Sequence, residues 1–307
     1  FPTVVSPNPE EKAALTMAIE KAKKVNADVV LATDPDADRV GIAVKDNNGE
    51  FVLLNGNQTA ALLTYYILGR WNELSKFSGK EYIVKTIVTT ELLIDIANKY
   101  NVKSFDVLTG FKFIADTILN NPEMTFVCGG EESYGFLIGD FVRDKDANSA
   151  CFMIAEIAAW AAEQNKSLYQ ILKEIYKEFG FYKEGLISLT KKGISGTEEI
   201  KNMMRKFREE PPTEILGSRI VEIKDYKIGI SKDIISGKET EIKLPKSDVL
   251  QFFTEDGTKI SVRPSGTEPK IKFYFGIKAE LNDIADFDTV NDKLNNRLNE
   301  LGKLFSE

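Results

Sequence analysis

Helical and strand-forming patterns alternate along the middle of this chain, and this alternation restricts the possible folds more than any other feature. A helical segment begins with NGNQTAALLTYYILGRW, and helical patterns near 91–100 and 111–119 lie between the β-rich segments YIVKTIV and TFVCGG. Such alternation is typical of βαβ units in a layered sheet. The later segment NSACFMIAEIAAWAAEQN is apolar nearly all round a helix, so we expect neighbours to cover it. The sequence therefore predicts one α/β domain over residues 54–180.

The last part of the chain has a different pattern. After KEFGFYKEG the predicted strands are shorter, a lysine-rich helix is expected near 197–209, and two prolines at 211–212 break the chain. A final helix over about 284–305 is expected to pack on the strands TKISV and KIKFYFGI. These segments predict an α+β domain over residues 181–307.

The first 53 residues combine a helix with strands. Asn8 and Pro9 are typical of a helix N-cap and a first helical position, so we expect a helix from there to about Val25. The helix leads into DVVLA, and an acidic loop separates this run from VGIAV. Both runs are β-branched, which is typical of strands buried on both faces. A layer of this size buries little surface alone, so we expect it to be the second half of a domain.

The composition excludes several classes of function. The net charge of −7 is spread along 307 residues, which argues against a nucleic-acid partner. There is no apolar run near about 18 residues and no signal peptide, so we expect a cytoplasmic protein without a membrane partner. The two cysteines lack paired spacing, as is usual in a reducing compartment. The chain has no histidine, so any acid–base chemistry falls to carboxylates, lysine, tyrosine or water.

Three aspartates alternate in the acidic loop DPDADR. If the loop is roughly extended, Asp34, Asp36 and Asp38 point the same way, so their carboxylates converge and repel. A cation would offset the repulsion, and hard oxygen ligands suit Mg²⁺ or Ca²⁺. An EF-hand is excluded, because Arg39 and Lys45 occupy the positions of its glycine and its bidentate glutamate. We interpret the loop as a metal site, and a solvated turn is the alternative.

The turn RPSGTEPK carries more polar groups than a hairpin connection needs. Arg263 offers a planar fork for phosphate, and Ser265 and Thr267 add hydroxyl donors. Gly266 lets backbone N–H groups close on an anion. The turn is therefore interpreted as a phosphate site, with a plain structural turn as the alternative.

Two further loops carry candidate ligands. CGGEESYGF presents Glu131, Glu132 and Ser133 at a strand end, where paired acceptors and a hydroxyl suit the hydroxyl groups of a polyol. A solvated loop explains these residues equally well. In TGFKFI, Lys112 follows Gly110 at a strand-to-helix turn, where a second anion would meet a helix N-terminus. A surface lysine is the commoner case.

A hard-cation site, a polyol loop and phosphate loops together indicate an enzyme that acts on a phosphosugar, and here the chain resembles a known family. DPDADR, GEESYG and RPSGTEPK are similar to the metal, sugar and phosphate loops of the α-D-phosphohexomutase superfamily, the phosphoglucomutases and phosphomannomutases. SPNPEE and TGFKFI agree as well, and the match runs the length of the chain. The resemblance implies layered α/β/α domains with mixed sheets, followed by a C-terminal α+β domain with helices on one face of its sheet.

The resemblance also implies a reaction and a role for each candidate residue. In such enzymes a phosphoserine held on Mg²⁺ gives its phosphoryl group to the sugar phosphate, the bisphosphate turns round, and the other phosphate returns to the serine. The phosphoryl group thereby moves between the 1- and 6-positions of a hexose phosphate. The implied roles are metal ligation by Asp34, Asp36 and Asp38, a place near the phosphoserine for Arg39 and in the cleft for Lys112, sugar binding by Glu131 and Ser133, and phosphate binding by Arg263, Ser265, Gly266 and Thr267.

Two departures from the family pattern matter. Some members carry a histidine after the sugar-loop serine, whereas this chain has Tyr134 and Gly135 there. The family's Ser-His-Asn-Pro type of serine loop does not occur in the sequence. The resemblance therefore implies a C-terminal fragment, with the end of domain two at 1–53, domain three at 54–180 and domain four at 181–307. Without the N-terminal half of the same polypeptide we expect it to be inactive.

Two other functions are open at this point. A metal-dependent sugar-phosphate phosphohydrolase also uses aspartates at a strand end. Haloacid-dehalogenase-like enzymes, however, follow Asp-x-Asp with an apolar residue and then Thr or Val, whereas Asp38 occupies that last position here. A non-catalytic phosphosugar-binding module would keep the sugar and phosphate loops without a nucleophile. The motifs do not discriminate among glucose, mannose and pentose phosphates.

Overall fold

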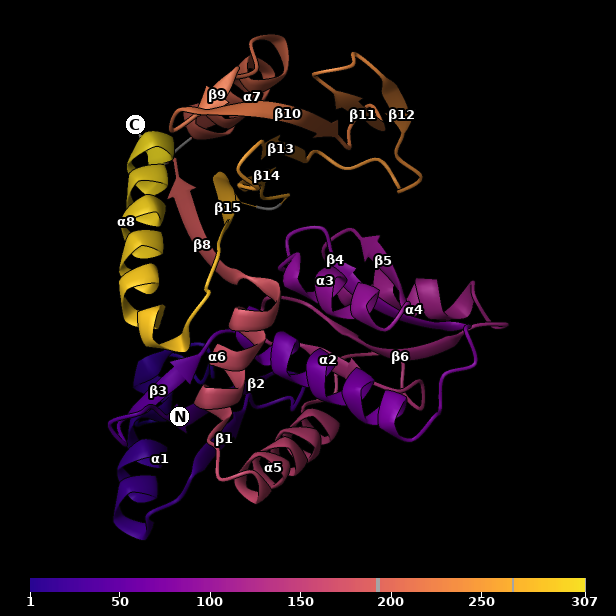
Figure 1. The fold of residues 1–307 in the computed structure, drawn as a ribbon. Coiled ribbons are helices and arrows are strands. Elements are labelled where there is room, and N and C mark those ends of the chain that lie inside the picture. The colour runs from indigo at the N-terminus through magenta and orange to yellow at the C-terminus, as the bar shows by residue number, and fades with distance from the viewer. Residues whose placement is uncertain (192–193, 267, 307) are drawn as a thin grey trace. The chain divides into compact units, whose positions relative to one another are not determined.

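The computed structural model describes residues 1–191, 194–266 and 268–306. The chain divides into two compact units, residues 1–179 and 180–307 (Figure 1). The first unit contains an antiparallel and a mixed sheet with their helices, and the second contains one large antiparallel sheet with helices. This confirms the predicted succession of layered α/β structure and a C-terminal α+β domain.

The N-terminal unit begins with a helix and a three-stranded antiparallel sheet. Helix α1 (Lys12–Val25) precedes β1 (Val29–Thr33), β2 (Val40–Lys45) and β3 (Phe51–Leu54), which pair in that order. The β1–β2 register places Thr33 opposite Val40, so the acidic loop is the hairpin connection. The helix is held on the sheet by a small apolar core of Leu15, Ala22, Val30 and Ala43.

Two sequence expectations for this region are corrected. Helix α1 begins at Lys12 rather than at Pro9, because the Asn8 side chain accepts a hydrogen bond from the Glu10 N–H and its carbonyl accepts one from the Glu11 N–H. These bonds form a turn that competes with the helix. Strand β1 is only partly buried, because it lies at the edge of its sheet, whereas β2 is buried along nearly its whole length.

The second layer of this unit is a four-stranded mixed sheet. The parallel strands β5 (Lys103–Val107), β4 (Glu81–Thr86) and β6 (Thr125–Gly130) lie side by side, and β7 (Phe136–Ile138) pairs antiparallel with β6. Helices α3 (Leu92–Lys99) and α4 (Phe111–Leu119) form the crossovers between the parallel strands. The carboxyl ends of the three parallel strands therefore lie along one edge of this sheet.

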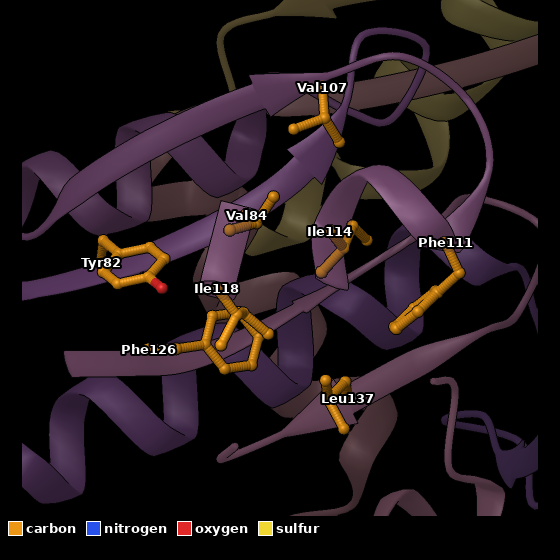
Figure 2. Close-up of a cluster of buried hydrophobic side chains, with 8 residues drawn as sticks. All are labelled: Tyr82, Val84, Val107, Phe111, Ile114, Ile118, Phe126 and Leu137. Atoms are coloured by element: carbon orange, nitrogen blue, oxygen red, sulfur yellow. The ribbon is translucent and has the colours of Figure 1, made fainter. Parts of the chain in front are cut away.

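Helix α4 is anchored to the mixed sheet by a buried apolar cluster (Figure 2). Phe111, Ile114 and Ile118 of α4 pack against side chains from all four strands. The strand residues of the cluster are Tyr82, Val84, Val107, Phe126 and Leu137. This packing fixes the start of α4, where Gly110 and Lys112 lie.

The remaining helices of the unit are α2 (Gly56–Glu73), α5 (Ala147–Glu163) and α6 (Leu168–Phe179). Helix α2 packs against α3, α5 and α6. The expectation that neighbours cover α5 all round is wrong. The helix buries a stripe that includes Ile154 and Ile157 but leaves Phe152 71% exposed.

The C-terminal unit is built on an antiparallel sheet with the strand order β12-β11-β10-β13-β14-β15-β8, and β9 pairs with β10. The bounds of its strands are β8 (Phe181–Thr190), β9 (Glu214–Ile215), β10 (Ser218–Asp225), β11 (Ile230–Asp233), β12 (Glu239–Glu241), β13 (Leu250–Thr254), β14 (Lys259–Pro264) and β15 (Lys270–Ala279). The helices are α7 (Ile194–Glu209) and α8 (Phe287–Ser306), the latter preceded by the 3₁₀ turn η1 (Ile284–Asp286).

Both long helices of this unit cover the same face of its sheet. Phe207 of α7 and Phe305 of α8 each pack on Phe273 of β15, with ring centroids 6.2 and 5.2 Å away, and on each other at 6.1 Å. Since the three rings share one cluster, the helices lie on one side of the strand, as the resemblance implied. Within the described ranges of the chain, no helix has the length and apolar character needed to cross a membrane.

Candidate functional site

The three aspartates of the β1–β2 connection gather at one point. Asp34, Asp36 and Asp38 each offer a carboxylate oxygen within 4.8 Å of the other two. The assumption of an extended loop is wrong, because the chain turns through Ala37, whose φ is 56°, and the Ala37 N–H donates to the Asp34 carbonyl. The convergence that the sequence predicted nevertheless holds. A tight turn, rather than strand alternation, produces it.

Asp34 organises this loop. Its Oδ1 accepts hydrogen bonds from the backbone N–H groups of Asp38 (3.0 Å) and Arg39 (2.9 Å). Such side-chain-to-backbone bonds are typical of aspartate in turns. One oxygen of Asp34 therefore shapes the loop, and its Oδ2 lies 3.8 Å from the Arg39 Nε.

Asp38 carries the clearest indication of a ligand-binding role. Its Oδ2 pairs with Lys145 Nζ at 2.9 Å. Its Oδ1 is buried and has no hydrogen-bond partner among the described residues, although the Arg39 Nε lies 3.8 Å away. Buried polar atoms are nearly always hydrogen-bonded or ligated, so an orphaned carboxylate oxygen calls for an explanation.

The donor set fits a hard divalent cation. Carboxylate oxygens on opposite sides of an octahedral Mg²⁺ are about 4.2 Å apart, and those around Ca²⁺ are up to about 5 Å apart. The three aspartate oxygens lie within 4.8 Å of one another, so they could approach one cation together. Asp36 is exposed, which leaves the outer side of the cluster open to water or to a phosphate oxygen.

Lys145 is a member of this site that sequence reasoning missed. It lies between β7 and α5, and its Nζ contacts Asp38 and stands 5.6 Å from the centre of the Phe111 ring. Burial lowers the pKa of Lys145, but the hydrogen bond and charge of Asp38 outweigh burial and raise it. Lys145 is therefore a cation at neutral pH. Gly135 leaves room for its stem, because a Cβ there would lie 2.2 Å from the Lys145 Cδ.

The loop between β6 and β7 (residues 131–135, here the sugar loop) lies directly beside the acidic loop. The Val40 N–H donates to the Tyr134 carbonyl at 3.0 Å, and Arg39 forms an isolated bridge with Gly135. On its other side, Glu131 accepts a hydrogen bond from the Gly110 N–H at 2.8 Å. Three of the sequence-predicted motifs thus meet within the N-terminal unit.

The candidate ligands of these loops differ in exposure. Glu131 and Ser133 are half-buried. Lys112 is exposed in the first turn of α4, with its Nζ 5.0 Å from the centre of the Phe113 ring. Tyr134 follows the sugar-loop serine, in the part of the loop where some family members carry a histidine. Burial and the charge of Glu10 raise the pKa of Tyr134 to about 12, so its hydroxyl is protonated at neutral pH.

Glu132 does not join Glu131 as a paired acceptor on the surface, contrary to the sequence interpretation. Its Oε2 lies within hydrogen-bond distance of the hydroxyl oxygens of Thr86 (3.1 Å) and Thr89 (3.2 Å), at the end of β4. Burial raises the pKa of the Glu132 carboxyl group. The two adjacent glutamates therefore lie in different environments. The sequence could not reveal this difference, because it depends on contacts with β4.

The predicted phosphate loop connects β14 and β15 in the C-terminal unit. Arg263 is opposite Lys272 in the strand register, and the Ser265 N–H donates to the Lys270 carbonyl at 2.7 Å. The Ser265 hydroxyl accepts from the Glu268 N–H at 3.3 Å. A Cβ on Gly266 would meet no atom of the other described residues within 4 Å, so packing against them does not require glycine there. Thr267 lies outside the described residues.

Comparison with known protein families gives three matches in chain order. Residues 1–49 match the family model "Phosphoglucomutase/phosphomannomutase, alpha/beta/alpha domain II", and residues 55–179 match the corresponding model of domain III. Residues 220–287 match the model of the C-terminal domain of the same family. The acidic loop lies in the first range, the sugar loop in the second and the phosphate loop in the third.

Curated proteins and solved structures give consistent results. The chain is 38% identical over 299 residues to a phosphoglucomutase of Staphylococcus epidermidis, which covers 97% of this chain and 53% of that protein. It is 39% identical over 296 residues to a phosphoglucomutase of Staphylococcus aureus strain MRSA252, with 96% and 52% covered. The chain therefore spans about half the length of these relatives.

Two solved structures share the fold. The open form of the exocytosis-sensitive phosphoprotein pp63/parafusin, a phosphoglucomutase from Paramecium, aligns with a TM-score of 0.61 at 18% identity, over 96% of this chain and 50% of that one. A phosphoglucomutase/phosphomannomutase family protein from Burkholderia thailandensis aligns with a TM-score of 0.57 at 16% identity, over 95% and 51%.

Proposed function

The chain belongs to the phosphoglucomutase/phosphomannomutase family, and on this premise we propose that it forms the metal-binding and substrate-binding part of a phosphosugar mutase. The reaction would move a phosphoryl group between the 1- and 6-positions of a hexose phosphate through a bisphosphate. A substrate of this kind agrees with a cytoplasmic location and needs neither a nucleic-acid nor a membrane partner.

One observation supports the proposal most strongly. The three converging aspartates lie beside the sugar loop, with an orphaned Asp38 oxygen in their midst. Asp34, Asp36 and Asp38 would hold Mg²⁺, the cation that phosphoryl-transfer sites most often use with carboxylates. When bound, the ion would neutralise charge on the phosphoryl group during transfer, which is the main catalytic requirement of such reactions.

The charged side chains beside the aspartates would prepare this place for a phosphoryl group. Arg39 is held by Glu10 at 3.2 Å and lies 3.8 Å from two of the aspartates, and Lys145 is held by Asp38. Both cations would donate hydrogen bonds to phosphoryl oxygens. Lys145 would also serve in proton transfer, because this chain has no histidine. Its ammonium could give a proton to a substrate alkoxide, and the neutral amine could take one from a substrate hydroxyl.

The remaining candidates would bind the substrate. Glu131 would accept hydrogen bonds from sugar hydroxyls, and Ser133 would exchange hydrogen bonds with them. Lys112 would contribute positive charge at the start of α4. In the C-terminal unit, the non-reacting phosphate would be bound by Arg263, Ser265, Gly266 and Thr267.

The phosphoryl-carrying serine would come from a partner segment. We infer that this segment corresponds to the half of the curated relatives that the chain does not cover, because the present sequence has no Ser-His-Asn-Pro type of loop. The preference among glucose, mannose and pentose phosphates is a separate question that the loops do not decide.

The proposal is tested by joining the uncovered half of the S. aureus relative to this chain and assaying glucose 1-phosphate with Mg²⁺ and catalytic glucose 1,6-bisphosphate. A mutase produces glucose 6-phosphate, and the yield falls when Asp36 is replaced by alanine. Release of inorganic phosphate in place of an isomeric sugar phosphate would instead identify a phosphohydrolase. Binding of glucose 6-phosphate without either reaction would favour a binding module.

A further inference from the structure

Glu132 is a buried acid for which the proposed mechanism has no use. It follows Glu131 in the sugar loop, and as a whole residue it is half-buried, but its carboxyl group is enclosed by protein atoms. The backbone around it is tightly placed as well. A Cβ on Gly56, at the start of α2, would lie 2.0 Å from the Glu132 carbonyl oxygen. The side chain and the backbone of Glu132 are therefore both fixed by packing.

Three oxygen atoms meet at this carboxyl group. The Thr86 and Thr89 hydroxyl oxygens are 2.8 Å apart, and the Glu132 Oε2 is 3.1 Å from the first and 3.2 Å from the second. All three separations are hydrogen-bond distances, so three protons are needed. The two threonines supply one hydroxyl proton each. An ionised carboxylate supplies none, whereas a protonated carboxyl group supplies the third.

The charges around the group favour the same state. The nearest cation on the strand that carries Thr86 is Lys85, and its ammonium is bound by Asp106 at 2.8 Å and by Glu91 at 3.1 Å. Glu131 in the same loop is a like charge, which favours the neutral acid. The first turn of α2 contains no acidic residue and adds nothing to this effect. Burial is the largest effect and raises the pKa of Glu132, and the charge of Glu131 also raises it. Hydrogen bonds from the Glu132 backbone N–H and from the two hydroxyls oppose this rise without cancelling it.

We propose that Glu132 is a positioning residue: as a neutral carboxylic acid it closes a hydrogen-bonded ring with Thr86 and Thr89 and so fixes the loop that presents Glu131 and Ser133 to the sugar. The ring itself follows from the geometry of the N-terminal unit. Its effect on sugar binding rests on the proposed function.

When Glu132 ionises, the ring loses the proton that closes it. A second negative charge also appears beside Glu131, and the nearby Lys85 is already paired with Asp106 and Glu91. The sugar loop must then loosen from the end of β4. Because the folded-state pKa is raised, this ordering is present at low pH and is lost as the pH rises through that folded-state pKa.

The first experiment reads the protonation state directly and needs no substrate. Infrared spectra of the wild-type chain at neutral pH should contain a protonated carboxylic-acid band that is absent from Glu132→Gln. Glu81→Gln is the matched control, because Glu81 is a buried glutamate at the start of β4 whose hydrogen bonds lower its pKa. The band should survive in that variant.

Either of two results would overturn the ring. One is a wild-type spectrum without the band at neutral pH, and the other is a band that persists in Glu132→Gln. If Glu132→Gln does not fold, the wild-type band alone decides. It should disappear only at a pH well above about 4.3, the value of an ordinary glutamate.

The second experiment measures the affinity for glucose 6-phosphate by calorimetry above about pH 7, where the ligand phosphate is already largely ionised. The wild-type affinity should fall as pH rises, approaching tenfold per pH unit above the pKa of Glu132. Glu132→Gln should bind with little pH dependence, and Glu132→Ala should bind weakly throughout. The same pH dependence in wild type and Glu132→Gln would overturn the positioning role. No binding by the wild type would overturn the proposed function, while the infrared result still decides the ring.

Discussion

Asp36 differs from the other two aspartates of the acidic loop because nothing in the described structure engages its carboxylate. Asp34 shapes the turn through two backbone hydrogen bonds, and Asp38 pairs with Lys145. Replacing either of these also disturbs the loop. Asp36 is exposed, so its replacement isolates the effect on a bound cation.

We therefore predict that Asp36→Ala weakens Mg²⁺ binding by at least about tenfold without reducing stability, since two carboxylates hold a strongly hydrated ion poorly. Calorimetric titration of Mg²⁺ into the chain measures this. Asp28→Ala is the matched control, because Asp28 is 93% exposed before β1 and lies outside the cluster, and it should bind Mg²⁺ like the wild type. Equal affinities of the two variants would remove the metal assignment.

Arg263 allows a second prediction at the scale of one side chain. Arg263→Ala should weaken the binding of glucose 6-phosphate by about 1.5–3 kcal/mol, the range for a charge-assisted hydrogen bond. Calorimetry of the variant and the wild type gives this difference. Arg297→Ala removes an arginine from α8 that pairs with Asp256, and it should leave the affinity unchanged. If Arg263→Ala binds as tightly as this control, the phosphate loop has been misplaced.

At this scale, the sequence reveals residues whose partners are close in the chain. The clustering of the aspartates could be predicted, because three carboxylates within five positions are necessarily close in space. Lys145 could not, because its contact with Asp38 depends on how α5 packs near β1 and β2. The different environments of Glu131 and Glu132 depend likewise on hydroxyls at the end of β4.

Among the secondary-structure elements, α2 shows how one glycine fixes the position of a loop. Its N-terminus is closed by a capping box between Asn55 and Gln58, and Gly56 then lies against the sugar loop. We predict that Gly56→Ala destabilises the N-terminal unit by about 1–3 kcal/mol, the usual cost of overpacking.

Gly69 provides the matched control within the same helix. A Cβ there would meet only the Tyr100 hydroxyl at 3.4 Å, an ordinary contact, so Gly69→Ala should stabilise by about 0.5–1 kcal/mol through helix propensity. Urea unfolding followed by tryptophan fluorescence measures both, because Trp71 and Trp160 lie in the N-terminal unit. Equal stability of the two variants would contradict the close approach of the sugar loop to α2.

The start of β4 makes a pH-dependent contribution to stability. Burial alone would raise the pKa of Glu81, but hydrogen bonds from Ser78 and Gly79 outweigh it and lower the pKa. A lowered folded-state pKa gives stability that is present above the unfolded value of about 4.3 and is lost as the pH falls through the folded value.

Glu81→Gln should therefore be less stable than the wild type at neutral pH and should lose less stability on acidification. Urea unfolding at a series of pH values from neutral to acid checks this by tryptophan fluorescence. The two stability curves should approach each other at acid pH. Parallel curves would show that Glu81 has the same pKa in the folded and unfolded states.

The elements most predictable from the sequence are those with strong periodicity. The predicted strand at 125–130 and helix at 111–119 agree with β6 and α4, whose apolar residues fill the core of Figure 2. Strand β5 was missed, because KSFDV lies at a sheet edge and is mostly polar. Backbone pairing with β4, rather than its own composition, stabilises this segment as a strand.

At the scale of the whole molecule, the order of three loops carried more information than any one of them. Each loop alone admitted a structural explanation, and each lies in a different range matched by the family models. Their joint occurrence indicates one family, because three unrelated turns would not by chance resemble the metal, sugar and phosphate loops of that family in the same order. The domain limits predicted at 53 and 180 stay a prediction, although the two compact units divide after residue 179.

The last prediction concerns turnover by this chain alone. Incubated with glucose 1-phosphate, Mg²⁺ and catalytic glucose 1,6-bisphosphate, it should form no glucose 6-phosphate above the blank. A mutase of this type needs a nucleophile that carries the phosphoryl group between turnovers. Ser133 and Ser265 lie in loops that we propose bind the substrate, and they lack the flanking residues of a phosphoserine segment.

A coupled dehydrogenase assay measures the product, and an intact S. aureus phosphoglucomutase serves as the positive control. Weak binding of glucose 6-phosphate should persist in the inactive chain, because RPSGTEPK is complete in its sequence. Binding without turnover would indicate a missing nucleophile. A misassigned substrate would instead abolish both binding and turnover. Steady turnover, with contaminating mutase excluded by mass spectrometry, would mean that a residue of this chain carries the phosphoryl group.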